Sequence, residues 1–446
     1  MTQPAADAAP LPAPARHSAW RLLAYGGLGL PLAMAALPIY VHVPKFYADT
    51  LGLSLASIGF LLLLARAFDA IQDPLLGYWS DRTRQTGRGR GVWIGVGAPL
   101  LALGMIGLFV PPELSTTGLS IWLVAMLLVV YTAYSMITIS YQAHGAEMSA
   151  DPNERTRIVS FREGLGLIGV FLAAALPEIL SKLSGARAGF AQFSYLFGPL
   201  IVILALVMMR SSPPAVTTHV SDEKRIFAVM LKPFGNASFR PLLWIFVMNG
   251  IAASIPATLV LFFIEDAIQR PDLTAQFLIA YFAAGAAGMP LWVKLSSRIG
   301  KGRAWFCGMI LSIAAFVWAF LLGPGDATAF FIICIMSGLG LGADLALPPS
   351  ILADVIDIDE RAGKGRNEGA YFGLWNLVTK GNLALAAGVA LPLLGWLGYA
   401  PKGSHSTEVL TALAAVYALL PCMLKAVAAL LLWRSPFFDS PQKDPS

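Results

Sequence analysis

Two acidic residues stand inside a long apolar stretch near residue 70. Asp69 and Asp73 are four positions apart, so a helix presents both carboxylates on one face, one turn from each other. A carboxylate that faces lipid costs on the order of 3 kcal/mol at the centre of a membrane-spanning helix. Two of them on one face therefore indicate a polar cavity that holds a small cation, a proton or a basic side chain. The plainer alternative is an Arg66–Asp69 ion pair together with a helix-end cap near Pro74.

The composition identifies a membrane protein. The chain has 446 residues, of which 57% are hydrophobic and 13% are charged, whereas soluble chains have about 25% charged residues. The net charge of +5 does not indicate a nucleic-acid partner, because the basic residues lie in short loops between apolar runs. No zinc spacing, catalytic triad or nucleotide-binding motif is present, so we expect no enzyme activity and no cofactor.

Twelve apolar segments have the length, roughly 20 residues or more, that crosses a bilayer. We expect these spans at residues 19–43, 53–79, 92–111, 118–146, 158–181, 191–210, 240–264, 273–297, 303–322, 328–355, 369–395 and 408–433. The expected domains are a disordered cytoplasmic N-terminus at 1–18, a six-helix bundle with the cation site at 19–210, a cytoplasmic linker at 211–239, a second six-helix bundle at 240–433 and a cytoplasmic tail at 434–446.

The basic residues determine the expected orientation, because cytoplasmic loops are rich in Lys and Arg. If both termini are cytoplasmic, most basic residues lie in inside loops, and the outside loops hold only Lys45, Lys182, Arg187, Arg270 and Lys402. We therefore expect a multi-pass protein of the inner (plasma) membrane with both termini in the cytoplasm.

A weak repeat divides the chain into two similar halves. A short loop rich in Gly and Arg and ending in Trp follows the second span at residues 79–93, and a similar loop follows the eighth span at 294–305. Two halves of six spans are typical of the major facilitator fold, in which solute binds near the midplane between the halves. The predicted fold is therefore an all-α membrane protein with twelve transmembrane helices in two pseudo-symmetric six-helix halves.

Five motifs, in order along the chain, resemble the glycoside–pentoside–hexuronide:cation symporters of the major facilitator superfamily. The most specific is residues 66–77, which is similar to the family's second-helix signature. The others lie at 47–54, at 154–162, at 354–360 with 365–369, and at 380–381 with 395–401. The resemblance implies cation-coupled symport of a small solute, such as a sugar, glycoside or uronide, by alternating access.

The resemblance also implies a cation site on the second and fourth helices. Asp69 and Asp73 match the family's two cation-binding carboxylates, and Gln72 stands where an asparagine ligand occurs. Ser135 matches a hydroxyl ligand, with Thr132 as a competing alignment. Hard oxygen donors suit a small cation such as sodium, and two neighbouring carboxylates can instead share one proton. The coupling ion is therefore Na⁺ or H⁺, and the sequence leaves both open.

The expected solute site combines basic and neutral polar residues. By the same resemblance, Arg162 contacts solute and Lys380 lies near the cation. Ala33 stands where sugar carriers have an acid, and acids hold sugar hydroxyls through charge-assisted hydrogen bonds. Asp344 either binds solute or pairs with Lys425. The remaining candidates are Thr138, Gln142, Trp375 and Asn376.

Charged residues near the ends of the second and tenth spans predict an inner gate. Asp357 is expected to pair with Arg298 or Arg366 when the cytoplasmic side is closed, and Asp81 is expected to act in the same way. The alternative for these residues is a solvated charged loop. Partly exposed ion pairs are worth only about 0–1 kcal/mol each, which suits a switch whose two states differ by a few kcal/mol.

Other kinds of function remain open. One is an uncoupled or cation-coupled carrier of an amphiphile or an organic anion, and another is a receptor or enzyme on a transporter frame. The expected partners are a small-molecule solute, the coupling cation and the lipid bilayer, with no nucleic acid. We expect a monomer, by analogy with this architecture.

Overall fold

The computed structural model describes residues 16–85, 89–212, 231–361, 367–399 and 406–438, and these residues form helices and connecting turns. The first half contains α1 (Ala19–Gly26), α2 (Gly29–Lys45), η1 (Phe46–Thr50), α3 (Leu55–Gln85), α4 (Gly91–Phe109), α5 (Thr116–Glu147), α6 (Pro152–Ser184) and α7 (Ala186–Ser211). The second half contains η2 (Lys232–Gly235), α9 (Phe239–Phe262), η3 (Phe263–Ile268), η4 (Pro271–Leu273), α10 (Thr274–Ile299), α11 (Lys301–Phe316), η5 (Val317–Leu321), α12 (Ala327–Arg361), α13 (Glu368–Trp396), α14 (Thr407–Ala414), η6 (Ala415–Leu419) and α15 (Leu420–Trp433).

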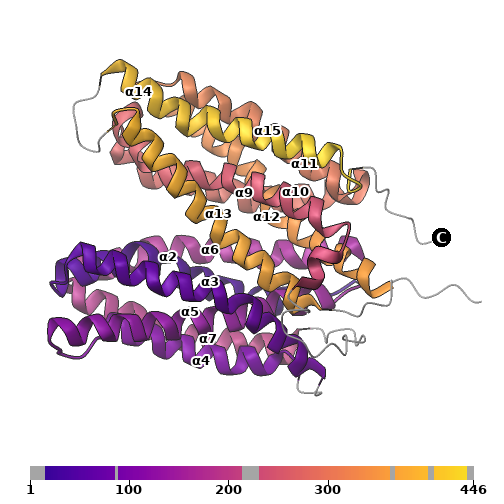
Figure 1. Cartoon of the computed structure of the whole chain (residues 1–446), viewed down its shortest axis with the longest axis horizontal. Helices are drawn as coiled ribbons and strands as arrows, with labels where there is room; N and C mark the ends of the chain where they lie inside the picture. The colour runs from indigo at the N-terminus through magenta and orange to yellow at the C-terminus, as the bar shows by residue number, and fades with distance from the viewer. Residues whose placement is uncertain (1–15, 86–88, 213–230, 362–366, 400–405, 439–446) are drawn as a thin grey trace, which may run out of the picture.

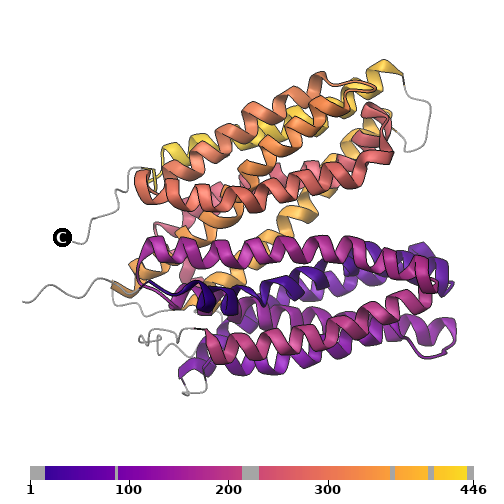
Figure 2. The same cartoon turned by 180° about the vertical axis from the view of Figure 1, so that it is seen from behind.

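Two helical bundles lie side by side, and each comes from one half of the chain (Figures 1 and 2). α13 crosses obliquely between the bundles (Figure 1). One buried apolar cluster lies in the first half and another lies in the second half. A further cluster mixes residues from both halves, such as Leu76 and Ile139 with Leu347 and Phe372. The halves therefore share part of their core.

Nine helical segments within the described residues are long and apolar enough to cross a membrane. They correspond to nine of the twelve expected spans, and the other three expected spans fall on α1–α2, α3 and α13. In α3, Arg66, Asp69 and Asp73 interrupt the apolar stretch. The all-helical fold is confirmed, and the count of twelve spans stays a prediction. The expected N-terminal tail at 1–18 and the expected linker at 211–239 lie mostly outside the described residues.

The two halves meet closely where α3 crosses α13. A Cβ added to Gly77 would lie 2.1 Å from the carbonyl oxygen of Gly369, and one added to Gly369 would lie 2.2 Å from that of Gly77. A Cβ on Gly373 would lie 2.9 Å from the carbonyl oxygen of Asp73. Glycine is therefore required at this crossing, because only a residue without Cβ lets the two backbones approach so closely.

The crossing predicts a sharp difference between two alanine substitutions on α13. Gly369→Ala forces α3 and α13 apart at a cost of about 1–3 kcal/mol. Gly381→Ala adds a methyl group that meets nothing within 4 Å. The reporter is Ser350→Cys, because Ser350 is fully buried and its hydroxyl lies 2.8 Å from that of Thr156 in the other half. We expect Gly369→Ala, and not Gly381→Ala, to accelerate maleimide labelling of this cysteine. Equal labelling rates in the two variants would contradict a closed crossing.

Candidate functional site

A lysine from the second half contacts both acidic residues of the first half. Lys380 Nζ, on α13, lies 2.6 Å from Asp69 Oδ2 and 2.8 Å from Asp73 Oδ2, both on α3. The partner of Asp69 is therefore Lys380, whereas Arg66 is exposed. α3 also continues through Pro74 to Gln85, so the alternative of a helix-end cap is wrong. These ion pairs join the two halves of the protein.

Neutral oxygen and nitrogen atoms surround the carboxylates. Ser135 Oγ, on α5, donates to Asp69 Oδ1 at 3.2 Å and accepts from Lys380 Nζ at 3.2 Å. Gln72 Nε2 donates to Asp69 Oδ1 at 3.1 Å. Thr132 Oγ1 donates to Gln72 Oε1 at 2.8 Å, so Thr132 acts through Gln72 rather than on a carboxylate. Asp69, Gln72, Ser135 and Thr132 are thus linked by hydrogen bonds, and Asp73 joins them through its ion pair with Lys380.

The group is buried but can be reached from one side. Asp69 is 3% exposed and Asp73 is fully buried, whereas the side chain of Lys380 is 25% exposed. Asp73 Oδ1 has no hydrogen-bond partner among the described residues. A buried carboxylate oxygen without a partner is costly. The arrangement can therefore accept a proton or a small cation beside Asp73, and Lys380 is the internal cation that it would displace.

α5 presents a polar face to α13 beyond the carboxylates. Ser135, Thr138 and Gln142 are spaced so that they share one side of the helix. At one end of this face Ser135 contacts Lys380, and at the other Gln142 Oε1 accepts from Asn376 Nδ2 at 3.1 Å. The hydroxyl of Thr138, between these contacts, is buried without a partner among the described residues. It is the polar atom there that a solute can satisfy.

The two other expected solute residues have their own partners. Trp375 stacks on Phe246 within the second half, with ring centroids 3.6 Å apart. Arg162, on α6, is buried and donates to Glu163 Oε1 from Nε at 2.9 Å and from Nη2 at 2.6 Å. The charge of Arg162 is therefore balanced by its own helix. Glu163 was not expected at the site, although its position next to Arg162 in the sequence was the available signal.

A second buried ion pair lies inside the second half. Lys425 Nζ lies 2.5 Å from Asp344 Oδ2 and donates to Asn249 Oδ1 at 2.8 Å. Trp305 Nε1 donates to Asp344 Oδ1 at 2.8 Å. Of the two alternatives for Asp344, the structure has the pair with Lys425. This group ties α9, α11, α12 and α15 together, and breaking a buried pair from one side typically costs about 3–5 kcal/mol.

Two further charged groups join the halves at one end of the molecule. We call this the interlocked end, and its defining residues are Asp81, Arg90, Arg155, Asp357 and Glu368. In the first group, Arg90 Nη2 lies 2.6 Å from Asp81 Oδ1, 2.8 Å from Glu147 Oε1 and 3.4 Å from Glu368 Oε2. Burial alone would lower the pKa of Arg90, but these carboxylates raise it above its usual value. Arg90 therefore stays charged and holds the group together.

Asp81 also contacts the backbone of the other half. Its Oδ1 accepts from the N–H of Gly369 at 2.8 Å and its Oδ2 accepts from the N–H of Ala370 at 3.1 Å, in the first turn of α13. A carboxylate at a helix N-terminus is stabilised by the unpaired N–H groups and the helix dipole. Asp81 thus caps a helix across the interface between the halves.

The second group at the interlocked end joins α6 to α12. Arg155 Nη1 lies 2.5 Å from Asp357 Oδ2 and 3.2 Å from Asp354 Oδ1. Lys301 Nζ lies 2.5 Å from Asp354 Oδ2. Among the described residues, the partner of Asp357 is thus Arg155 and not Arg298, while the expected pairing with Arg366 stays a prediction. Arg298 is exposed, and Arg366 lies outside the described residues.

These features define a class of protein. An all-helical chain with apolar spans, whose two halves meet around a buried charged site, is a membrane transporter of the major facilitator type. The model of the family described as MFS/sugar transport protein matches residues 22–438. The chain belongs to this family, and the expected family resemblance is confirmed.

Relatives and solved structures agree with this assignment. The chain is 24% identical over 393 residues to the putative glycoside/cation symporter YagG of Escherichia coli (strain K12), which covers 87% of this chain and 85% of the relative. It is 21% identical to the glucuronide carrier protein homolog of the same organism, with 95% and 94% covered. The crystal structure of the E. coli fucose:proton symporter is similar in fold, with a TM-score of 0.66, 12% identity, and 93% of this chain and 97% of that chain covered.

The carboxylate group predicts how Lys380→Met changes stability. The variant leaves two buried carboxylates without their counter-charge, so we expect a loss of about 3–5 kcal/mol at pH 8 in potassium chloride. An external cation or proton at the carboxylates would supply the missing charge, so lowering the pH or adding sodium should restore more stability to the variant than to the wild type. Unfolding temperatures in the two salts at pH 8 and pH 6 measure this. The control is Lys294→Met, at an exposed position. If both variants respond alike, Lys380 does not compete with the coupling ion.

Proposed function

We propose that this protein is a secondary active transporter that couples the entry of a small polar solute to sodium or a proton. The observation that carries the proposal is the contact of Lys380 with both Asp69 and Asp73 across the two halves. A site shared by both halves is where a bound cation can change how the halves fit together. The names of the relatives favour a sugar, glycoside or uronide as the solute.

One helix stripe links the cation site to the interlocked end. Asp69, Asp73, Gly77 and Asp81 recur every four residues on α3, so they lie along one side of the helix. Asp69 and Asp73 contact Lys380. Gly77 lies against the backbone of Gly369, and Asp81 accepts from the first turn of α13. A shift of α13 at Lys380 is therefore transmitted directly to the contacts of Asp81.

The proposed cycle follows from charge balance. In the empty carrier, Lys380 pairs with both carboxylates and offsets one of their two negative charges. A sodium ion or a proton at Asp69 and Asp73 takes over this role and releases Lys380 toward the solute cavity. Solute then binds beside Thr138, Gln142 and Asn376. If Lys380 moves away while no ion occupies the site, the charges of the lysine and the carboxylates are left unpaired in the membrane. We therefore expect only the empty and the fully loaded carrier to reorient readily.

The arrangement of the halves supports an outward-facing state. The interlocked end holds the halves together through Arg90, Arg155 and the cap on α13, and the positive-inside pattern favours a cytoplasmic position for this end. Opening to the cytoplasm requires these pairs to break. Both termini in the cytoplasm, residence in the inner membrane and action as a monomer belong to the same proposal.

The polar atoms of the site favour a hydroxyl-bearing solute. The buried Thr138 hydroxyl lacks a partner among the described residues, and the amides of Gln142 and Asn376 can each donate and accept. An amphiphile would leave these atoms unsatisfied. A sugar or a uronide can satisfy them.

Transport by reconstituted protein tests the proposal. Proteoliposomes would be given radiolabelled methyl glucuronide or methyl galactoside, with an inward sodium gradient, an inward proton gradient or neither. We expect one gradient to drive accumulation, and we expect Asp73→Asn to reduce uptake at least about tenfold and to remove its dependence on the ion. Asp272→Asn is the control, since Asp272 is exposed and pairs only with exposed Arg270 among the described residues. Ion-dependent uptake that persists in Asp73→Asn would overturn the proposal.

A further inference from the structure

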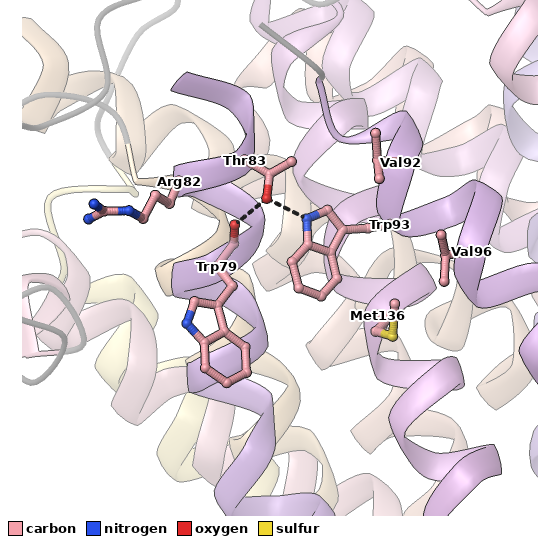
Figure 3. Close-up of a pocket in the computed structure, with 7 residues that line it drawn as sticks. All are labelled: Trp79, Arg82, Thr83, Val92, Trp93, Val96 and Met136. Carbon is pink, nitrogen blue, oxygen red and sulfur yellow. Dashed lines mark hydrogen bonds between the residues drawn. The ribbon is translucent and has the colours of Figure 1, made fainter. Parts of the chain in front are cut away.

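A groove lies on the outside of the first half, away from the carboxylates. It has a volume of about 510 Å³ and lies between the end of α3 and the start of α4, with α5 behind them (Figure 3). Trp79, Val92 and Val96 are 43–53% exposed, although all three are apolar. The lining residues are Trp79, Arg82, Thr83, Val92, Trp93, Val96 and Met136.

In the inner part of the groove, the hydrogen-bonding side-chain groups of Trp93 and Thr83 are bonded within the protein. The indole N–H of Trp93 donates to Thr83 Oγ1 at 3.0 Å, and the Thr83 hydroxyl donates to the carbonyl oxygen of Trp79 at 2.9 Å (Figure 3). Val96 and Met136 complete this part. What enters here must therefore be apolar, because a polar group would lose its hydrogen bonds to water.

The rim of the groove is positively charged. Arg82 is exposed, and its guanidinium points away from the two indole rings (Figure 3). Its Nη1 donates to the phenol oxygen of Tyr78 at 3.2 Å, and it makes no ion pair with a described residue. The neighbouring Asp81 is buried against Arg90 and does not neutralise it. The rim therefore attracts an anion.

The groove lies where α3 leaves the membrane. The apolar part of α3 ends near Trp79, and Ser80, Asp81, Arg82 and Thr83 follow. Exposed Trp is typical of the membrane–water boundary. An apolar groove below this boundary with a cation above it matches one molecule in two parts, namely an acyl chain and a charged headgroup. The positive-inside pattern places it in the cytoplasmic leaflet, which carries anionic lipid.

We propose that this groove binds a phospholipid with an anionic headgroup. The phosphate pairs with Arg82, and an acyl chain lies between Trp79 and Trp93 against Met136 and Val96. This site is separate from the solute site and does not depend on transport. α3 also carries Asp69, Asp73 and Asp81, which contact the second half. The bound lipid therefore packs on the same helix that joins the two halves.

Quenching of tryptophan fluorescence tests the site. The full-length protein would be reconstituted in phosphatidylcholine bilayers with increasing fractions of brominated phosphatidylglycerol or, in parallel, brominated phosphatidylcholine. We expect brominated phosphatidylglycerol to quench more strongly than brominated phosphatidylcholine. The double variant Trp79→Phe with Trp93→Phe should remove this difference in quenching. Arg82→Gln should weaken the preference for phosphatidylglycerol about fivefold, the effect of one basic residue near an anionic surface.

A matched site in the second half supplies the control. Arg240 and Trp244 are both exposed and lie one turn apart at the start of α9. Arg240→Gln should leave the preference unchanged, because no lining residue of the groove lies on α9. Equal quenching by the two lipids, or a preference that survives Arg82→Gln, would overturn the lipid site. Either result would leave the transport proposal intact, since that rests on uptake.

Discussion

Two buried carboxylates in a membrane require a cation beside them at every stage of the protein's work. Asp69 and Asp73 are almost inaccessible, and Lys380 from the other half supplies the positive charge. The pairing does more than balance charge, because it connects α3 to α13 and therefore the first half to the second. Any ion that replaces Lys380 also removes a link between the halves. In the proposed function, this single constraint would couple ion binding to conformation without a separate relay.

The geometry of α3 extends that link over the length of the interface. The same side of the helix carries the carboxylates, the glycine at the backbone crossing and the carboxylate that caps α13. A movement of α13 at one contact also changes the other contacts, since two helices packed backbone to backbone do not deform independently. The ion pairs of Arg90 with Glu368 and of Arg155 with Asp357 then add charge pairing to this close packing at the interlocked end.

Local spacing in the sequence predicted the parts of the site that depend on one helix. The four-residue interval of Asp69 and Asp73, the apolar runs and a charged Asp344 inside a span could be predicted in this way. The pairing of Asp344 with Lys425 was one of two alternatives, and the structure decides between them. The partner of Asp357 was not readable, because Arg155 lies about 200 positions away and its selection depends on how the halves pack. The same holds for Arg90, which gathers acidic residues from the ends of three helices. Helix propensity and hydropathy carry no information on such contacts between distant segments.

The most direct test of the account is the chemical reactivity of Lys380 in the intact protein. Its side chain is 25% exposed, so a water-soluble acetylating reagent can reach it, and peptide mass spectrometry can follow its modification. We expect Lys380 to react faster once its carboxylates have another cation, as in saturating sodium compared with potassium at one pH. We expect the same in the variant Asp73→Asn, which imitates a protonated site. A reactivity of Lys380 that changes in neither condition would contradict the claim that the coupling ion displaces this lysine.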